Sequence, residues 1–323
     1  MSLQYAKFTP QALYINEHAE TIFLDECLEL IQSGNVEIGM MKLGSALHNL
    51  YASTTTGEWE RLVKFELLQH PISRLLMQDP LTARSYQRPR GYAGDAKLLD
   101  MVYFPEQLDM RNISPLGMQL FRYTARTSLS IALIERIRLV ASLIDETANN
   151  TPKARVLSVA AGHCREAEYS QTLRANKLAR FLALDHDSRS LEIANHHYGT
   201  LGIETTCQSV TRLLKANDEV GEFDLIYSAG LYDYLSKRFA QKLTKQLFNL
   251  LAPGGRLVLM NIDTDYKEIG YMESFMNWSM VGRSALDLLE LANDLGSDEH
   301  AVLNLQKHQN VSTHFHILEI IKT

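Results

Sequence analysis

A short apolar run, a turn of small residues and a second apolar run that ends in an acid follow one another between residues 155 and 187. The first run leads into Ala160, Ala161 and Gly162, and Asp185 ends the second run. This order is typical of a nucleotide-binding βαβ unit, in which a helix follows the turn and the acid binds ribose hydroxyls. A dinucleotide site requires several glycines, so that a pyrophosphate can approach the backbone, and this turn has only Gly162. The sequence therefore predicts a site for a nucleoside without a pyrophosphate.

The chain after residue 150 continues this alternation of short apolar runs and helix-length segments. Further apolar runs occupy residues 223–227 and 256–262. This alternation predicts a parallel sheet that is covered by helices on both faces. The last run, residues 313–321, alternates and is followed by no helix, which predicts an antiparallel edge strand.

The first 150 residues show a different pattern. Apolar residues recur with a period near 3.6 over residues 22–31, 38–50 and 58–68, and residues 115–147 predict one long or once-broken helix. Residues 149–152 have the composition of a linker. We therefore expect an all-α domain at residues 1–150, which covers the substrate, and a catalytic α/β domain at residues 151–323.

Composition excludes several classes of protein. The chain has 323 residues, 46% of them hydrophobic, and its net charge of −6 disfavours nucleic-acid partners. Its three cysteines form no CxxC pair, which indicates a reducing compartment and argues against a zinc site. The first residues lack a signal-peptide pattern, and no run of about 18 apolar residues could span a membrane. We expect a cytoplasmic protein without a bound metal; the sequence leaves a homodimer open.

Four segments now carry a resemblance. Residues 156–162, 183–185, 223–227 and 250–255 stand in the order and spacing of class I S-adenosylmethionine-dependent methyltransferases. The chain resembles that family over residues 150–323. The resemblance implies a Rossmann-like, doubly wound, seven-stranded and mostly parallel sheet with an antiparallel last strand, preceded by an all-α domain. It also implies S-adenosylmethionine as cofactor. Many family members have an acid at the position of Ser158 and glycines at those of Ala160 and Cys164.

A narrower resemblance rests on residues 87–95 and 162–166. Together these segments are similar to a bacterial subgroup labelled 3-hydroxy fatty acid methyl ester biosynthesis proteins. This resemblance implies a small acidic acceptor with an apolar chain.

The cofactor residues follow from the family pattern and from what the cofactor requires. Asp185 would accept both ribose hydroxyls, although it could instead cap the next helix, a role equally open to Asp187 or Ser188. His186 would pack beside the ribose or adenine, or simply be exposed. The full set of expected cofactor residues is Ala160, Ala161, Gly162, His163, Asp185, His186, Ser209, Val210, Ser228 and Ala229.

The acceptor residues are expected in two segments. Arg88 and Arg90 could present guanidinium groups to a carboxylate, with Tyr92 and Asp95 in the same loop. Alternatively, these arginines pair with acids across the domain boundary and Asp95 caps a helix. Asp233 and Tyr234, with Tyr92, are the candidate catalytic residues, and Tyr232 and Trp278 are candidate pocket walls. The alternative places the tyrosines in a half-buried lid and uses Asp233 as a helix cap.

The acceptor atom can be narrowed by a proton argument. An amine with a pKa near 10.4 must lose a proton before it attacks, which costs about 4.6 kcal/mol at pH 7 (roughly 3.4 units of 1.36 kcal/mol). A carboxylate is already a nucleophile, and no His-Asp base pair is evident near the motifs; His163, inside the turn, is the nearest exception, and Asp233 could hold the cofactor's amino group or act as a base. We therefore expect methyl transfer to an oxygen of a small, partly apolar acid. N-methylation of a small metabolite and a noncatalytic adenosylmethionine-binding sensor or partner are the alternatives.

Overall fold

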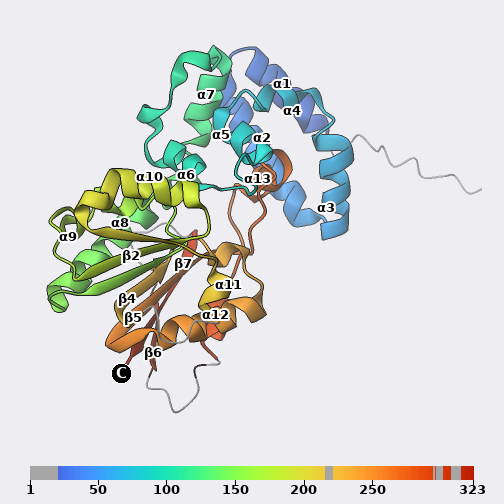
Figure 1. The fold of residues 1–323 in the computed structure, drawn as a ribbon. Helices are drawn as coiled ribbons and strands as arrows, with labels where there is room; N and C mark the ends of the chain where they lie inside the picture. Colours follow the sequence, from blue (N-terminus) through green and yellow to red (C-terminus); the bar gives the residue numbers. More distant parts are fainter. Residues whose placement is uncertain (1–20, 215–220, 294, 296–300, 307–313) are drawn as a thin grey trace, which may run out of the picture.

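The computed structural model describes residues 21–214, 221–293, 295, 301–306 and 314–323. A part rich in helices and a part built on a sheet lie side by side (Figure 1). Within these described residues no helix has the length and apolar character needed to cross a membrane.

Helices form over the ranges in which the apolar periodicity predicted them, and three further helices lie between residues 71 and 103. The helices before the sheet are α1 (Ile22–Gln32), α2 (Val36–Ser53), α3 (Thr56–Leu62), α4 (Pro71–Leu76), α5 (Pro80–Gln87), α6 (Ala96–Tyr103), α7 (Pro115–Thr124) and α8 (Ser128–Asn150). A π-helical turn, Val63–Leu67, extends α3 toward Pro71. Of the two alternatives for residues 115–147, the structure shows the once-broken helix, because the side chain of Thr127 caps a new helix by accepting from the Ser130 N–H.

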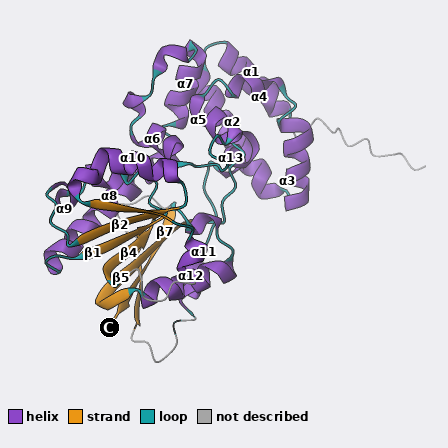
Figure 2. Cartoon of the chain, viewed as in Figure 1, coloured by secondary structure: helices purple, strands orange, loops and turns teal. Residues whose placement is uncertain are grey.

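A mixed sheet forms the other part (Figure 2). Its strands are β1 (Arg155–Val159), β2 (Arg180–Asp185), β3 (Ile203–Cys207), β4 (Phe223–Ser228), β5 (Leu251–Ile262), β6 (Ala301–Gln306) and β7 (Phe315–Lys322), in the order β3-β2-β1-β4-β5-β7-β6. β1 to β5 pair in parallel, whereas β7 is antiparallel to both β5 and β6. The predicted α/β class, the mostly parallel sheet and its antiparallel last strand are confirmed. The expectation that β7 is an edge strand is wrong, because β6 pairs along its outer side.

Helices cover both faces of this sheet, as the continuous apolar strands require. Leu157 and Val159 of β1 share a core with α12 (Lys237–Asn249), while Val156 faces a core with α8 and α10 (Ser188–Tyr198). Shorter helices complete the layers: α9 (Gln171–Arg174), α11 (Val210–Leu213) and α14 (Ala285–Leu289).

Two segments cross the expected division near residue 150. Leu143 and Ile144 of α8 pack with the sheet, so this helix belongs to the sheet's covering layer. In the opposite direction, α13 (Ile269–Phe275) follows β5 but packs against α2 among the N-terminal helices (Figure 1). The two parts are therefore joined by shared packing as well as by the linker.

Candidate active site

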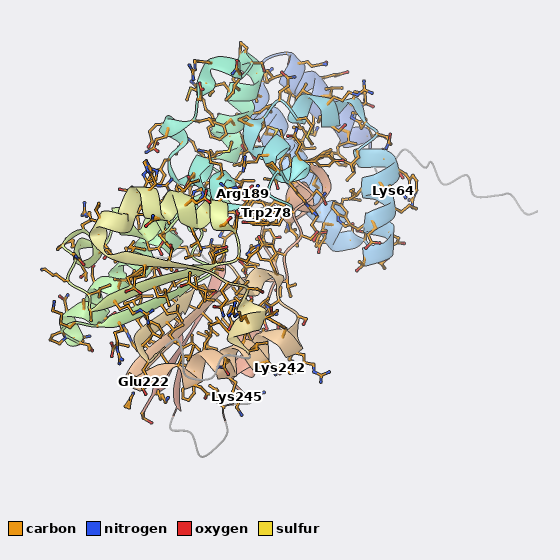
Figure 3. All side chains as sticks on the ribbon, in the orientation of Figure 1. Lys64, Arg189, Glu222, Lys242, Lys245 and Trp278 are labelled. Atoms are coloured by element: carbon orange, nitrogen blue, oxygen red, sulfur yellow. The ribbon has the colours of Figure 1, made fainter. Side chains whose placement is uncertain are left out.

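A cavity of about 730 Å³ lies at the carboxyl ends of β1, β2 and β4, where an open parallel sheet binds its ligands. Its other walls come from the loop at residues 88–96, from α8 and from residues 278–280. Trp278 lies where the sheet part meets the helical part (Figure 3). The structure thus brings together the β1 turn, the end of β2 and the 88–95 loop, the three segments to which the sequence analysis gave most weight.

The turn after β1 keeps a left-handed backbone although it has one glycine. Ala160, Gly162 and Cys164 have φ angles of 58°, 56° and 54°. This conformation costs a residue with a Cβ about 1–2 kcal/mol, so the surrounding contacts must hold it. The Ala161 N–H donates to the carbonyl of Leu184 at 3.1 Å, which fixes the turn to β2. The backbone therefore follows a path suited to glycine even where the glycines are replaced.

The helix expected after this turn is much shorter than predicted. Residues Arg165–Glu168 form a 3-10 turn and only the four residues of α9 follow as α-helix. The Cys164 N–H is already used by the carbonyl of Ala161. The dipole of a long helix therefore does not act at this turn.

Asp185 connects the β1 turn to the end of β2. It is 6% exposed, its Oδ2 accepts from the Gly162 N–H at 2.8 Å, and its Oδ1 accepts from the Asp187 N–H at 2.9 Å. A carboxylate has about four lone-pair sites, so two remain for ribose hydroxyls. The helix-capping alternative falls to Asp187, whose side chain accepts from the Arg189 N–H. His186 is exposed and lines the same end of the cavity.

Arg90 is engaged with an acid of the sheet part. Its Nη1 donates to Asp187 Oδ2 at 3.2 Å and to Ser190 Oγ at 2.8 Å. Burial favours a higher pKa for Asp187, but hydrogen bonds from Arg189 and Ser190 and the charge of Arg90 lower this pKa overall. The pairing across the boundary, which was the alternative to substrate binding, is the arrangement that the structure shows.

His163 is locked on both ring nitrogens. Arg90 Nη1 lies 3.2 Å from Nε2, and Asp100 Oδ2 lies 2.8 Å from Nδ1. Because a guanidinium can only donate, Nε2 accepts and Nδ1–H donates to Asp100. Burial alone would raise the Asp100 pKa, but hydrogen bonds from Arg165 and His163 lower it to about 2. His163 therefore positions the turn and has no ring nitrogen free to act as a base.

The other two polar residues of the loop also have local partners. Arg88 donates from Nη2 to both oxygens of Asn277. Asp95 caps α6 by accepting from the Leu98 N–H at 2.8 Å, pairs with Arg84 at 2.8 Å and does not line the cavity. The capping alternative for Asp95 is confirmed.

Two predicted acceptor residues, Trp278 and Tyr234, meet in the wall of the cavity. The Trp278 indole N–H donates to the Tyr234 hydroxyl at 2.8 Å, and Asp233 lies beside them in the wall. Asp233 is 2% exposed and its Oδ1 accepts from the Ile262 N–H at 2.7 Å. Burial raises the pKa of Asp233 to about 6, although the charge of Arg136 opposes this rise.

Of the two tyrosines Tyr92 and Tyr232, only Tyr92 lines the cavity. Tyr92 lines the cavity with its ring 5.4 Å from that of His186, and burial raises the pKa of its phenol to about 12. Tyr232 is fully buried in the sheet's core and its hydroxyl contacts Thr244 at 3.1 Å. The prediction that Tyr232 lines the acceptor pocket is wrong.

Three of the expected cofactor residues, Ser209, Val210 and Ser228, do not line this cavity. Ser209 is exposed and caps α11 by accepting from the Thr211 N–H, and neither it nor Val210 lines the cavity. Ser228 is fully buried and donates to the Val159 carbonyl, whereas Ala229 does line the cavity.

Several lining residues were missed by the sequence analysis. Arg136, Glu166 and Tyr227 are buried polar side chains in the wall. The Tyr227 hydroxyl donates to Glu166, and burial raises the pKa of that carboxyl. A signal for Arg136 existed, because it interrupts the apolar face of a helix between Leu133 and Val140.

Comparison with known proteins agrees with this geometry. Residues 156–255 match the sequence family described as methyltransferase domain. The match covers the β1 turn, Asp185 and the wall after β4. This match makes the chain a methyltransferase, with S-adenosylmethionine as its methyl donor.

Solved structures resemble the enzyme at low sequence identity. A possible exported protein from Bordetella parapertussis is 15% identical, with 96% of this chain and 99% of that chain covered and a TM-score of 0.54. Magnesium protoporphyrin IX methyltransferase from Synechocystis, with bound S-adenosylhomocysteine, is 12% identical over 76% of this chain and all of the other, at a TM-score of 0.49. The first likeness extends over the helical part as well as the sheet, and it shows the fold alone. No curated protein matches the sequence.

Proposed function

We propose that the enzyme transfers a methyl group from S-adenosylmethionine to a carboxylate oxygen of a small, partly apolar acid, such as a hydroxy fatty acid. One observation carries this proposal: a single cavity joins the Asp185 end to a wall of apolar side chains. That wall comprises Leu129, Leu133, Ile137, Met280 and Phe315. In this proposal, Asp185 and the β1 turn hold the donor, and residues 1–150 cover the acceptor in a cytoplasmic enzyme.

The engagement of His163 also favours an acceptor that needs no general base, such as a carboxylate. An acid with a pKa near 4.3 is deprotonated at neutral pH, so its methylation needs no general base. His163, the base nearest to the turn, has both ring nitrogens engaged. Positioning and exclusion of water are then the main tasks of the site.

The narrower likeness to 3-hydroxy fatty acid methyl ester biosynthesis proteins gains support from one contact. Its two segments, residues 87–95 and 162–166, are far apart in the sequence but meet through the hydrogen bond from Arg90 to His163. The loop therefore completes the donor turn, and we propose that both segments serve one acid-methylating site.

One feature of the wall favours a second candidate, N-methylation of a small metabolite. Asp233 faces the cavity and burial raises its pKa to about 6, which would suit a base that removes a proton from an ammonium group.

The two functions differ in the lability of their products. The enzyme is incubated with methyl-labelled S-adenosylmethionine and a metabolite extract, and the products are then treated with mild alkali. We expect most label to be released as volatile methanol, because alkali cleaves methyl esters but leaves N-methyl groups intact. The Asp185→Ala variant should lose transfer and bind S-adenosylhomocysteine at least tenfold more weakly, whereas Asp265→Ala, an exposed control outside the cavity, should match the parent.

Each other result rejects a part of the proposal. Label that stays bound after alkali would replace the ester by an amine product. Donor binding without transfer to any metabolite would indicate a sensor rather than an enzyme acting on acids.

A further inference from the structure

Arg136 is a buried cation in an otherwise largely apolar wall. It lies on α8, is 5% exposed and lines the cavity together with Leu133, Ile137 and Val140 of the same helix. Burying a guanidinium is costly unless its charge and its N–H groups are compensated. The partners of Arg136 therefore indicate the charge of the ligand that the cavity binds.

Within the protein, Arg136 forms a hydrogen bond with the phenol of Tyr103 but with no carboxylate. Its nearest carboxylate atom, Asp233 Oδ2, lies 3.8 Å from Nη1, beyond hydrogen-bonding distance, and its guanidinium carbon lies 4.7 Å from the centre of the Phe315 ring. The buried Nε has no hydrogen-bond partner among the described residues. Arg165, by contrast, makes three hydrogen bonds of 2.7–2.9 Å, two of them to Asp100.

The carboxylate nearest to Arg136 is shared with a second arginine. Asp233 also lies in the field of Arg283, so two guanidinium groups share one carboxylate. Glu166, another acid in the cavity wall, accepts from the Tyr227 hydroxyl. Arg136 therefore has no carboxylate of its own within hydrogen-bonding distance.

Arg136 lies away from the end of the cavity at Asp185, where the proposed function places the methyl donor. Asp185 ends β2, whereas Arg136 contacts Phe315 of β7 and lies 3.5 Å from where a Cβ on Gly230, after β4, would stand. In the strand order, β1 and its turn lie between β2 and β4. A donor held by Asp185 and the β1 turn would therefore present its methyl group toward the side where Arg136 stands.

We propose that Arg136 binds the carboxylate of the methyl acceptor. The inference rests on the proposed function and assigns to Arg136 the task that the sequence analysis gave to Arg90 or Arg88. One carboxylate oxygen accepts from the Arg136 guanidinium, while the apolar chain of the acid lies along Leu133 and Ile137.

The second carboxylate oxygen attacks the methyl carbon. The new O–CH3 bond forms as the S–CH3 bond breaks, and the sulfur keeps the electron pair of that bond. No proton moves, and the products are a neutral methyl ester and S-adenosylhomocysteine. Because the ester carries no charge, it binds Arg136 less strongly than the acid, which favours product release.

The test uses octanoate as the acid probe and octanamide as its uncharged counterpart, with the full-length enzyme saturated with S-adenosylhomocysteine. Calorimetry should show that the parent binds octanoate at least tenfold more tightly than octanamide. Arg136→Gln should lose this preference, with octanoate affinity at least tenfold lower, while affinity for S-adenosylhomocysteine stays within twofold. Arg136→Lys should retain part of the preference for octanoate, because lysine keeps the positive charge but lacks the planar guanidinium that can donate two parallel hydrogen bonds.

Arg138→Gln is the matched control, since Arg138 lies on the same helix but is exposed and does not line the cavity. Thermal melting establishes that each variant is folded, and Arg136→Lys keeps the test decisive if the glutamine variant unfolds. Unchanged octanoate binding in Arg136→Gln would overturn the assignment of Arg136 but leave the proposed function standing. Loss of S-adenosylhomocysteine binding with unchanged octanoate binding would assign Arg136 to the donor's own carboxylate and overturn the inference. A parent enzyme that does not prefer octanoate would reject both the acid acceptor and the role of Arg136.

Discussion

Gly94 lies where the 88–96 loop contacts the wall after β4. A Cβ at this position would lie 2.4 Å from the Trp278 ring and 2.9 Å from the Tyr234 hydroxyl. The lack of a side chain therefore allows the loop to approach the indole closely, while Trp278 keeps its hydrogen bond to Tyr234.

We expect Gly94→Ala to destabilise the enzyme and to impair methyl transfer. Gly91→Ala is the control, because Gly91 also has a positive φ, 91° against 66°, but a Cβ there meets nothing within 4 Å. Both variants carry the backbone strain of about 1–2 kcal/mol, and the collision should cost Gly94→Ala about 2 kcal/mol more. Urea unfolding measures the difference between the two free energies of unfolding. Equal decreases in the two variants would show that the Trp278 side chain moves aside without an energetic penalty.

Among elements, the turn after β1 holds the most strain. Ala160 and Cys164 both adopt positive φ, but Ala160 borders the cavity, whereas the side chain of Cys164 is fully buried in the core beside the sheet. A glycine would therefore relieve backbone strain at both positions, but at Cys164 it would also remove a buried side chain.

Ala160→Gly should stabilise the protein by about 0.5–1 kcal/mol. Relief of the left-handed strain gains about 1–2 kcal/mol, and the greater freedom of an unfolded glycine takes back about 0.5–1 kcal/mol. Cys164→Gly should give no gain, because it also removes buried apolar contacts. Urea unfolding of the two variants tests this; a loss of stability in Ala160→Gly would mean that the alanine side chain has a contact that outweighs the strain.

The elements that could be predicted are those specified by local pattern. The apolar runs of β1, β2, β4 and β5 and the acid Asp185 are readable within windows of a few residues. β6 was missed although it precedes β7 directly in the sequence, and β7 was consequently placed at the edge. Arg136 escaped notice because its significance comes from Asp233 and Phe315, which the fold brings beside it from far along the chain.

Across the whole molecule, two buried acids make stability depend on pH. Asp79 caps α5, is fully buried and accepts from the N–H groups of Leu81 and Thr82. Burial raises its pKa to about 6 and outweighs the lowering by these hydrogen bonds. The unfolded chain releases this proton near pH 3.9, so the native state loses stability as pH rises from about 4 to about 6. Asp233 acts in the same direction.

Asp79→Asn should therefore flatten the profile of melting temperature against pH. The variant keeps a capping residue but has no charge to bury, so it should lose about 3 kcal/mol less than the parent between pH 4 and about 6.5. Asp233 is present in both proteins and cancels in the comparison. Asp100, with its pKa of about 2, acts only at lower pH, where its stabilisation is lost as it protonates. Parallel profiles would contradict the assignment to Asp79.

Asp100 also links the helical part to the residues that follow the β1 turn, which limits where the chain can be cut into fragments. It belongs to α6, yet its carboxylate is the shared partner of His163 and Arg165, which immediately follow the donor turn. A fragment starting at residue 151 would retain every strand of the sheet but would leave the His163 and Arg165 side chains without their acid. The turn after β1 is therefore completed from outside the matched residues 156–255, and we expect the capacity to hold the cofactor to be a property of the undivided chain.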